Sequence, residues 1–130
     1  MKKKIVLYSE ESFFGGTVNC GIAEVVDSLA ITLADTYEVY VVCKEGDPYL
    51  AKTISELHFL SPGIKEGKLF KVNYILINSS EWPNKSYSFI NNLKPDIIHN
   101  FENPDLILHL NFKAKMIYTF DDVDYIKNKI

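Results

Sequence analysis

Apolar runs typical of buried strands alternate with apolar stripes typical of helices, and this alternation constrains the fold more than any other feature. Ile5 to Tyr8 form a continuous apolar run before a polar loop, which is typical of a strand buried on both faces. From Gly21 to Asp35, apolar residues recur at helical spacing and predict an amphipathic helix. Further strands are expected at 37–43, 69–77, 96–101 and 115–120, and further helices after Asp47, Ser80 and Asn103.

The segment between the second and third expected strands predicts a helix followed by an exposed loop. Asp47-Pro48 offers an N-cap acceptor and a ring already set to helical φ. Residues 62–68 carry charges and glycines, which favour a solvent-exposed loop. The apolar face of this helix would consist of Leu50, Ile54 and Leu57.

The alternation predicts an α/β fold, a three-layer Rossmann-like domain with a mostly parallel sheet of about five strands and helices on both faces. Residues 1–130 have the length of a single domain with its own core. In this architecture, ligands bind beyond the carboxyl ends of the strands. The loops that follow the strands are therefore where functional residues are expected.

Composition excludes several classes of function. The net charge of −3 leaves no basic excess for a nucleic-acid partner. Apolar stretches are all shorter than the roughly 18 residues that cross a bilayer, so no membrane span is expected. Cys20 and Cys43 have neither disulfide-framework nor metal-ligand spacing, which predicts reduced thiols in a cytoplasmic protein without a metal site.

The first strand is followed by an unusually long loop, Ser9 to Gly21, and such length is a sign of function. Glycines allow close approach of the backbone, and the next helix would present free N–H groups to a ligand. The loop matches neither a P-loop nor a dinucleotide fingerprint, and its glycines could equally serve only to shape a turn. The candidate substrate-binding residues here are Gly15, Gly16, Asn19 and Gly21.

Polar side chains follow the fourth and fifth expected strands. His99, Glu102 and Asp121 are candidate catalytic residues, and Asp122 is a candidate substrate-binding residue. Carboxylates and amides suit sugar hydroxyls as hydrogen-bond partners. The alternatives are that Glu102 and Asp121 are solvated acids or helix caps, and that His99 is a hydrogen-bonded strand histidine.

Several segments together resemble the N-terminal part of glycogen and starch synthases. They are Lys3-Lys4-Ile5-Val6-Leu7-Tyr8-Ser9-Glu10, Gly21-Ile22-Ala23-Glu24-Val25-Val26, Tyr37-Glu38-Val39-Tyr40-Val41-Val42, Pro95-Asp96-Ile97-Ile98-His99 and Met116-Ile117-Tyr118-Thr119-Phe120. The resemblance implies one half of a GT-B glycosyltransferase fold, the N-terminal half lining the acceptor side, with the C-terminal nucleotide-binding domain absent from this chain. It also implies a glycan acceptor and a sugar-nucleotide donor, such as ADP-glucose or UDP-glucose, and no further cofactor.

The chain departs from this family at its functional positions. The family's phosphate-binding lysine falls on Val18, and its sugar-contacting histidine and the asparagine beside it fall on Asp121 and Asp122. The resemblance therefore implies a hexosyltransferase domain that is inactive alone. The alternatives are a non-catalytic carbohydrate- or nucleotide-binding module of the same fold, and an unrelated doubly wound domain of the receiver or flavodoxin kind.

Overall fold

The apolar run at the start of the chain forms β1 (Lys4–Tyr8), which lies in the interior of the sheet. It pairs in parallel with β2 (Glu38–Lys44) on one side and with β6 (Ile97–Asn100) on the other. Leu7 faces one core and Val6 faces the other, and both side chains are fully buried. The prediction of a strand buried on both faces is confirmed.

The computed structural model describes residues 1–18 and 21–119. Beyond the three strands already named, the sheet contains β3 (Ser55–Ser61), β4 (Ile64–Leu69), β5 (Val72–Ile77) and β7 (Lys115–Tyr118). The helical elements are α1 (Ile22–Leu33), α2 (Pro48–Ala51), α3 (Asn84–Leu93) and the 3-10 turns η1 (Ser79–Glu81) and η2 (Leu106–His109).

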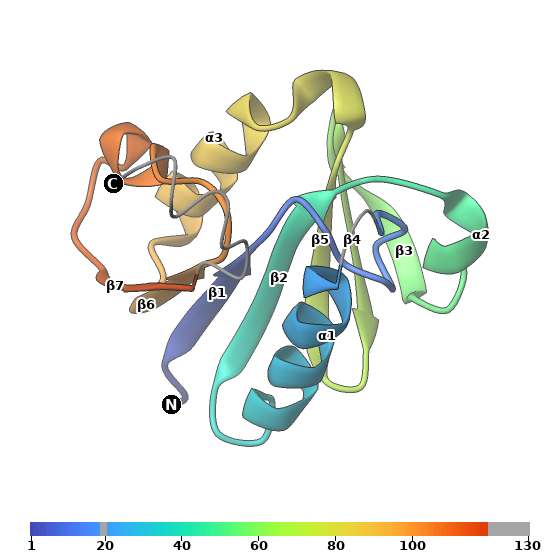
Figure 1. Ribbon diagram of the computed structural model, residues 1–130, viewed down its shortest axis with the longest axis horizontal. Coiled ribbons are helices and arrows are strands. Elements are labelled where there is room, and N and C mark those ends of the chain that lie inside the picture. Colours follow the sequence, from blue (N-terminus) through green and yellow to red (C-terminus); the bar gives the residue numbers. More distant parts are fainter. Residues whose placement is uncertain (19–20, 120–130) are drawn as a thin grey trace.

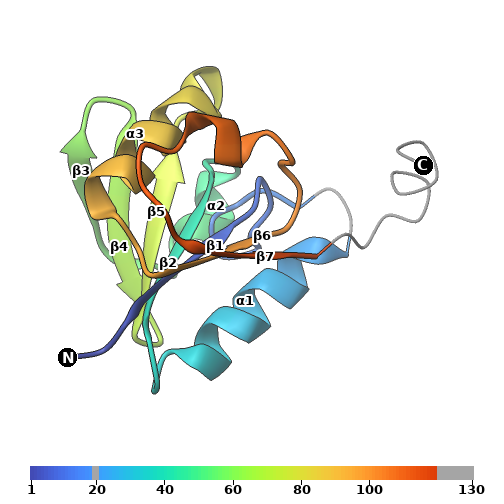
Figure 2. The ribbon, with the colours of Figure 1, turned by 90° about the vertical axis from the view of Figure 1, so that its left-hand side faces the viewer.

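The strands form one sheet in the order β3-β4-β5-β2-β1-β6-β7 (Figures 1 and 2). β5, β2, β1, β6 and β7 are mutually parallel, whereas β3, β4 and β5 pair antiparallel. The prediction of a mostly parallel, three-layer Rossmann-like domain with about five strands, as in one half of a GT-B fold, is therefore wrong. The fold is α/β with a seven-stranded sheet of mixed orientation and, in the described ranges, three α-helices.

The difference lies in the segment after Asp47. Helix α2 begins where predicted, and the Asp47 side chain accepts a hydrogen bond from the Tyr49 amide at 2.9 Å. The helix ends after Ala51, however, and the chain continues into the antiparallel β3–β4 hairpin. Strand β4 thus occupies most of the expected loop at 62–68, and Ile54 packs in the core beside the sheet.

A two-residue turn at Phe70 and Lys71 joins β4 to β5. Both residues have positive φ, 50° and 66°, the conformation of a type I′ turn that Asn-Gly usually supplies. The Phe70 ring packs against Phe14 with centroids 6.2 Å apart, and Lys71 Nζ lies 3.0 Å from Asp35 Oδ1. Because these partners are distant in sequence, the local residues gave no hairpin signal.

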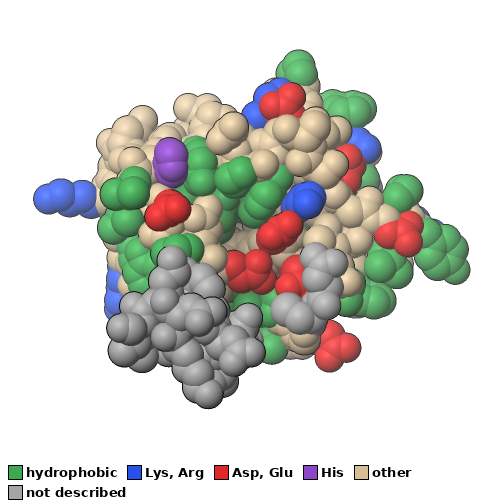
Figure 3. All heavy atoms as spheres, turned by 45° about the horizontal axis from the view of Figure 1, so that its top comes forward, with side chains coloured by type: hydrophobic (Ala, Val, Ile, Leu, Met, Phe, Trp, Pro, Cys, Tyr) green, Lys and Arg blue, Asp and Glu red, His purple; other side chains and the backbone are tan. Residues whose placement is uncertain are grey.

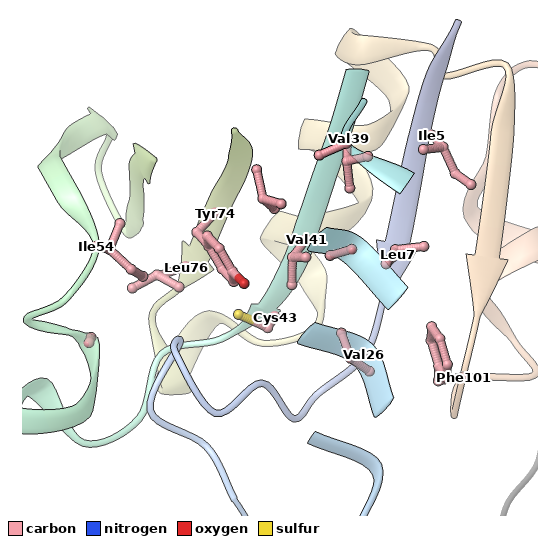
Figure 4. Packing of buried hydrophobic residues seen from close by; sticks show 14 of the residues in the cluster. Ile5, Leu7, Val26, Val39, Val41, Cys43, Ile54, Tyr74, Leu76 and Phe101 are labelled. Carbon is pink, nitrogen blue, oxygen red and sulfur yellow. The ribbon is translucent and has the colours of Figure 1, made fainter. Parts of the chain in front are cut away.

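Helices α1 and α3 pack on opposite faces of the sheet (Figure 2). Val26 and Ala30 of α1 pack against side chains of β1, β2 and β5, as Figure 4 shows for Val26. Ile90 of α3 packs in the second core with Val6 and Tyr8. In residues 1–18 and 21–119, no helix has the length and apolarity required to cross a membrane.

Candidate functional site

The order of the parallel strands reverses at β1. The chain proceeds from β1 to β2 and β5 on one side, then returns to β6 and β7 on the other. The connections that leave β1 and β6 therefore diverge at the carboxyl ends of these strands, where open α/β sheets hold ligands. The Phe101 amide donates to the Tyr8 carbonyl at 3.0 Å and keeps the two strand ends together.

Acidic side chains gather at this divergence. Ser9, Glu10 and Glu11 follow β1, and Glu102 follows β6; we call these four residues the acidic rim. Figure 3 shows acidic side chains (red) near the middle of this end of the molecule, beside a lysine (blue). Lys44 Nζ lies 3.3 Å from Glu10 Oε1, so the Glu10 carboxylate has a cationic partner.

Glu102 is the most perturbed carboxyl group of the rim. Its side chain is half-buried, and Oε1 is buried without a hydrogen-bond partner in the described part of the chain. Its pKa is raised to about 7, chiefly by burial and then by the charges of Glu11 and Glu10 and a hydrogen bond with Glu11, while a hydrogen bond with Ser9 opposes the rise. Near neutral pH, Glu102 is therefore close to the midpoint of its titration, where a carboxyl group can both take up and release a proton.

Asn100 holds the backbone around Glu102. Its side chain is 1% exposed, and its Oδ1 accepts from the amides of Glu102 at 3.3 Å and Asn103 at 3.0 Å. Asn103 in turn donates through Nδ2 to the Tyr87 hydroxyl at 3.1 Å. This turn fixes where the Glu102 side chain leaves the sheet. Both amides lie in the polar stretch whose acidic and amide side chains were expected to converge on this edge of the sheet, although neither was named as a candidate site residue.

His99 lies within β6, between Leu7 of β1 and Ile117 of β7. Its Nε2 lies 2.6 Å from Thr119 Oγ1, and its ring stacks on Phe101 with centroids 4.3 Å apart. Burial lowers the pKa of His99, so the ring is neutral at physiological pH. These contacts match the alternative of a hydrogen-bonded strand histidine, and a catalytic role for His99 stays a prediction.

Gly15 and Gly16 pack the β1–α1 loop against the β2–α2 loop. The Gly46 and Asp47 amides donate to the Gly15 and Gly16 carbonyls at 3.2 and 2.7 Å. A Cβ on Gly16 would stand 2.5 Å from the Asp47 carbonyl oxygen, and Gly16 has φ of +92°. Packing alone thus requires both glycines, and a role for them in substrate binding stays a prediction.

The remaining predicted site residues fall into two groups. Gly21 precedes α1, is exposed, and has nothing within 4 Å of the place where a Cβ would be. Asn19, Asp121 and Asp122 lie outside the described residues. Of the three candidate catalytic residues, the structure therefore places His99 and Glu102 near the same strand end.

Asp27 is a buried carboxylate that anchors the β1–α1 loop and that sequence reasoning did not assign to the site. It lies on α1, is 4% exposed, and accepts from Ser12 Oγ at 2.8 Å and from the Phe13 amide at 2.7 Å. Burial raises its pKa, and its hydrogen bonds oppose that shift. The available signal was a charged residue within the apolar stripe of the helix, between Val26 and Ala30.

The chain matches no protein-family model, and it matches no curated protein either. Among residues 1–18 and 21–119, no group of three or more His, Cys, Asp or Glu side chains is arranged to hold a metal ion. The chemistry of the acidic rim must therefore be argued from its own residues.

Proposed function

We propose that this chain is the acceptor-side domain of a glycosyltransferase that transfers a hexosyl unit from a sugar nucleotide to a glycan. The observation that carries the proposal is Glu102, a half-buried carboxyl group at the point where strand order reverses, whose Oε1 has no hydrogen-bond partner among residues 1–18 and 21–119. The resemblance to glycogen and starch synthases supplies the reaction class. Because the sheet is mixed and is not one half of a GT-B fold, the fold does not support this proposal, which rests on the acidic rim.

Glu102 acts as the general base in this proposal. Its ionised carboxylate accepts the proton of an acceptor hydroxyl while that oxygen forms a bond to the anomeric carbon of the donor. The bond from this carbon to the nucleoside diphosphate breaks, and the leaving group keeps the electron pair. A base with a pKa near the working pH is best suited to this transfer, and burial brings Glu102 to about 7.

The charge of the rim favours a glycan over a nucleotide. Glu10 and Glu102 are partly exposed and present carboxylates, which accept hydrogen bonds from hydroxyl groups and repel phosphates, whereas Glu11 is buried. The diphosphate of a donor would therefore need positive groups from outside this acidic rim. This agrees with the expectation that a separate nucleotide-binding domain completes the catalyst and that this chain alone is inactive. We propose the cytoplasm as the location of the protein.

A non-catalytic carbohydrate-binding module is the second candidate, since the same rim could hold hydroxyl groups without chemistry. The raised pKa of Glu102 favours the catalytic reading, because a site that only binds needs no carboxyl group poised near neutrality. The two candidates share an acceptor site and differ in whether Glu102 moves a proton.

An NMR titration of the full chain with maltoheptaose, ADP-glucose and UDP-glucose tests the acceptor site. We expect amide shifts from the oligosaccharide at residues 9–11 and 100–103, and weak or no shifts from either nucleotide. Glu102→Gln should weaken oligosaccharide binding, whereas Glu56→Gln, on the exposed β3 strand, should not change it. Tight nucleotide binding, or oligosaccharide shifts confined to the opposite edge of the sheet, would contradict the proposal.

A further inference from the structure

Asp27 accepts hydrogen bonds from two different parts of the fold. Ser12 Oγ and Tyr74 OH donate to Oδ1 at 2.8 and 2.9 Å, and the amides of Phe13 and Phe14 point at Oδ2 from 2.7 and 3.4 Å. Ser12, Phe13 and Phe14 belong to the β1–α1 loop, whereas Tyr74 belongs to β5. The carboxylate thus ties the loop to α1 and to the sheet at once.

Ser12, which Asp27 holds, follows Glu11 of the acidic rim directly in the chain. Ser12 is fully buried, its hydroxyl also accepts from the Gly15 amide at 3.1 Å, and its backbone forms a bridge with Thr17. Glu11, the residue before Ser12, is 4% exposed, and its amide donates to Ser9 Oγ at 3.0 Å. With Ser12 held on one side and Ser9 on the other, Glu11 has little freedom to move away from Glu102.

We infer that Asp27 is a positioning residue, which holds Ser12 and Phe13 so that Glu11 is kept buried beside Glu102. This positioning of Glu11 does not depend on the proposed function. Only its use, to keep Glu102 suited to act as a base, rests on that function. Asp27 itself is 4% exposed, and its carboxylate bonds the loop at Ser12 and Phe13. Its effect on Glu102 is transmitted by the loop.

The energetic reason is the cost of leaving buried donors unpaired. Without the carboxylate, the Ser12 and Tyr74 hydroxyls and the Phe13 amide would lack their acceptor in a site from which water is excluded. The loop would then relax toward solvent to recover these hydrogen bonds from water. Such a movement carries Glu11 outward and admits water to Glu102.

The test compares Asp27→Ala and Asp27→Asn with the unaltered protein by carboxyl ¹³C NMR of Glu102 during a pH titration. In Asp27→Ala, we expect the Glu102 pKa to fall by about one unit or more, because water enters and a neighbouring carboxylate withdraws. Asparagine keeps an acceptor for the Phe13 amide, so in Asp27→Asn the Glu102 pKa should fall less than in Asp27→Ala. The amides of Phe13 and Phe14 should exchange with solvent faster in the alanine variant.

Two further variants keep the result decisive. Ser12→Ala removes one loop contact and leaves the Asp27 charge in place, so it should lower the Glu102 pKa even where Asp27→Ala fails to fold. Asp35→Ala removes an exposed acid just beyond α1 and should leave the titration unchanged. An unaltered Glu102 titration in the folded Asp27→Asn and Ser12→Ala variants would overturn the inference. Because no glycan is present, that outcome is distinct from a failure of the proposed function.

Discussion

The hydroxyl groups of Tyr8 and Ser86 lie 2.7 Å apart and join the end of β1 to α3 inside the second core. Ser86 Oγ also donates to the Pro83 carbonyl, so Tyr8 is the donor of the pair. Burial raises the pKa of Tyr8, which keeps the hydroxyl protonated and able to donate. Strand β1, which leads into the acidic rim, is therefore fixed to α3 on the face of the sheet opposite to α1.

Tyr8→Phe should lower the free energy of unfolding by about 1–2 kcal/mol, because a buried acceptor on Ser86 loses its donor. Urea denaturation at neutral pH measures this as a lower midpoint with an unchanged slope. Tyr49→Phe, at a residue that is 68% exposed, is the matched control and should have no measurable effect. Equal midpoints for all three proteins would show that the Tyr8 hydroxyl contributes nothing.

Glu102→Gln should change how stability depends on pH. The folded pKa of about 7 lies above the ordinary value of 4.5, so the folded protein binds the proton more tightly than the unfolded chain. The contribution of this group is complete below the unfolded pKa and is lost as pH rises through the folded pKa, a loss of about 2–3 kcal/mol once solvent screening of this half-buried group is allowed for.

The glutamine variant should lack that loss. Relative to the unaltered protein, it should gain stability steadily from acidic to mildly alkaline pH, as followed by thermal or urea unfolding across the range. Glu24→Gln, at an exposed position in the first turn of α1, should not reproduce the trend. A stability difference between the Glu102→Gln variant and the unaltered protein that is constant with pH would mean that Glu102 titrates normally.

Gly16→Ala should destabilise the fold by at least about 2 kcal/mol, because a Cβ there overlaps the β2–α2 loop. Its nearest contact would be 2.5 Å from the Asp47 carbonyl oxygen, and φ of +92° adds strain. Gly21→Ala is the matched control, since Gly21 has open space and φ of −69°. Its stability should stay within about 0.5 kcal/mol of the starting protein in the same denaturation experiment.

Lys71→Gly should stabilise the β4–β5 turn. The φ of Lys71 is 66°, which costs a side-chain-bearing residue roughly 1–2 kcal/mol and costs glycine almost nothing. The ion pair with Asp35 that is lost is highly exposed, so solvent screening leaves it little contribution to stability. Thermal unfolding should show a higher midpoint, while Lys68→Gly within β4 should lower it. A lower midpoint for Lys71→Gly would mean that the ion pair outweighs the strain.

Local sequence patterns predicted the elements that are marked by an apolar run, by helical periodicity or by a capping residue. The apolar run at Ile5–Tyr8 and the stripe of α1 both identified their elements, and Asp47 identified the start of α2. The β4–β5 hairpin was missed because its turn at Phe70 and Lys71 depends on tertiary partners rather than on turn residues. That omission alone changed the fold from a mostly parallel sheet to a mixed one.

The site divides in the same way. Glu102 could be found because it directly follows a predicted strand, and every strand end of an α/β sheet is a place to look. The role of Asp27 could not be found, because one of its donors, Tyr74, is 47 residues away and belongs to another strand. Gly15 and Gly16 stood out as glycines, but only the tertiary packing explains them: a Cβ on Gly15 would meet Cys43 of β2, and one on Gly16 would meet the β2–α2 loop.

The contact between the two glycine-bearing loops also limits how this protein can diverge. The Gly15 and Gly16 carbonyls accept from consecutive amides of the neighbouring loop, and a Cβ on Gly46 would lie 2.0 Å from the Gly16 oxygen. An insertion in either loop would disrupt both hydrogen bonds unless the other loop changed in step. If the acidic rim binds a ligand as proposed, new ligand preferences should therefore arise by exchange of the partly exposed side chains Glu10 and Glu102, with both loop lengths unchanged.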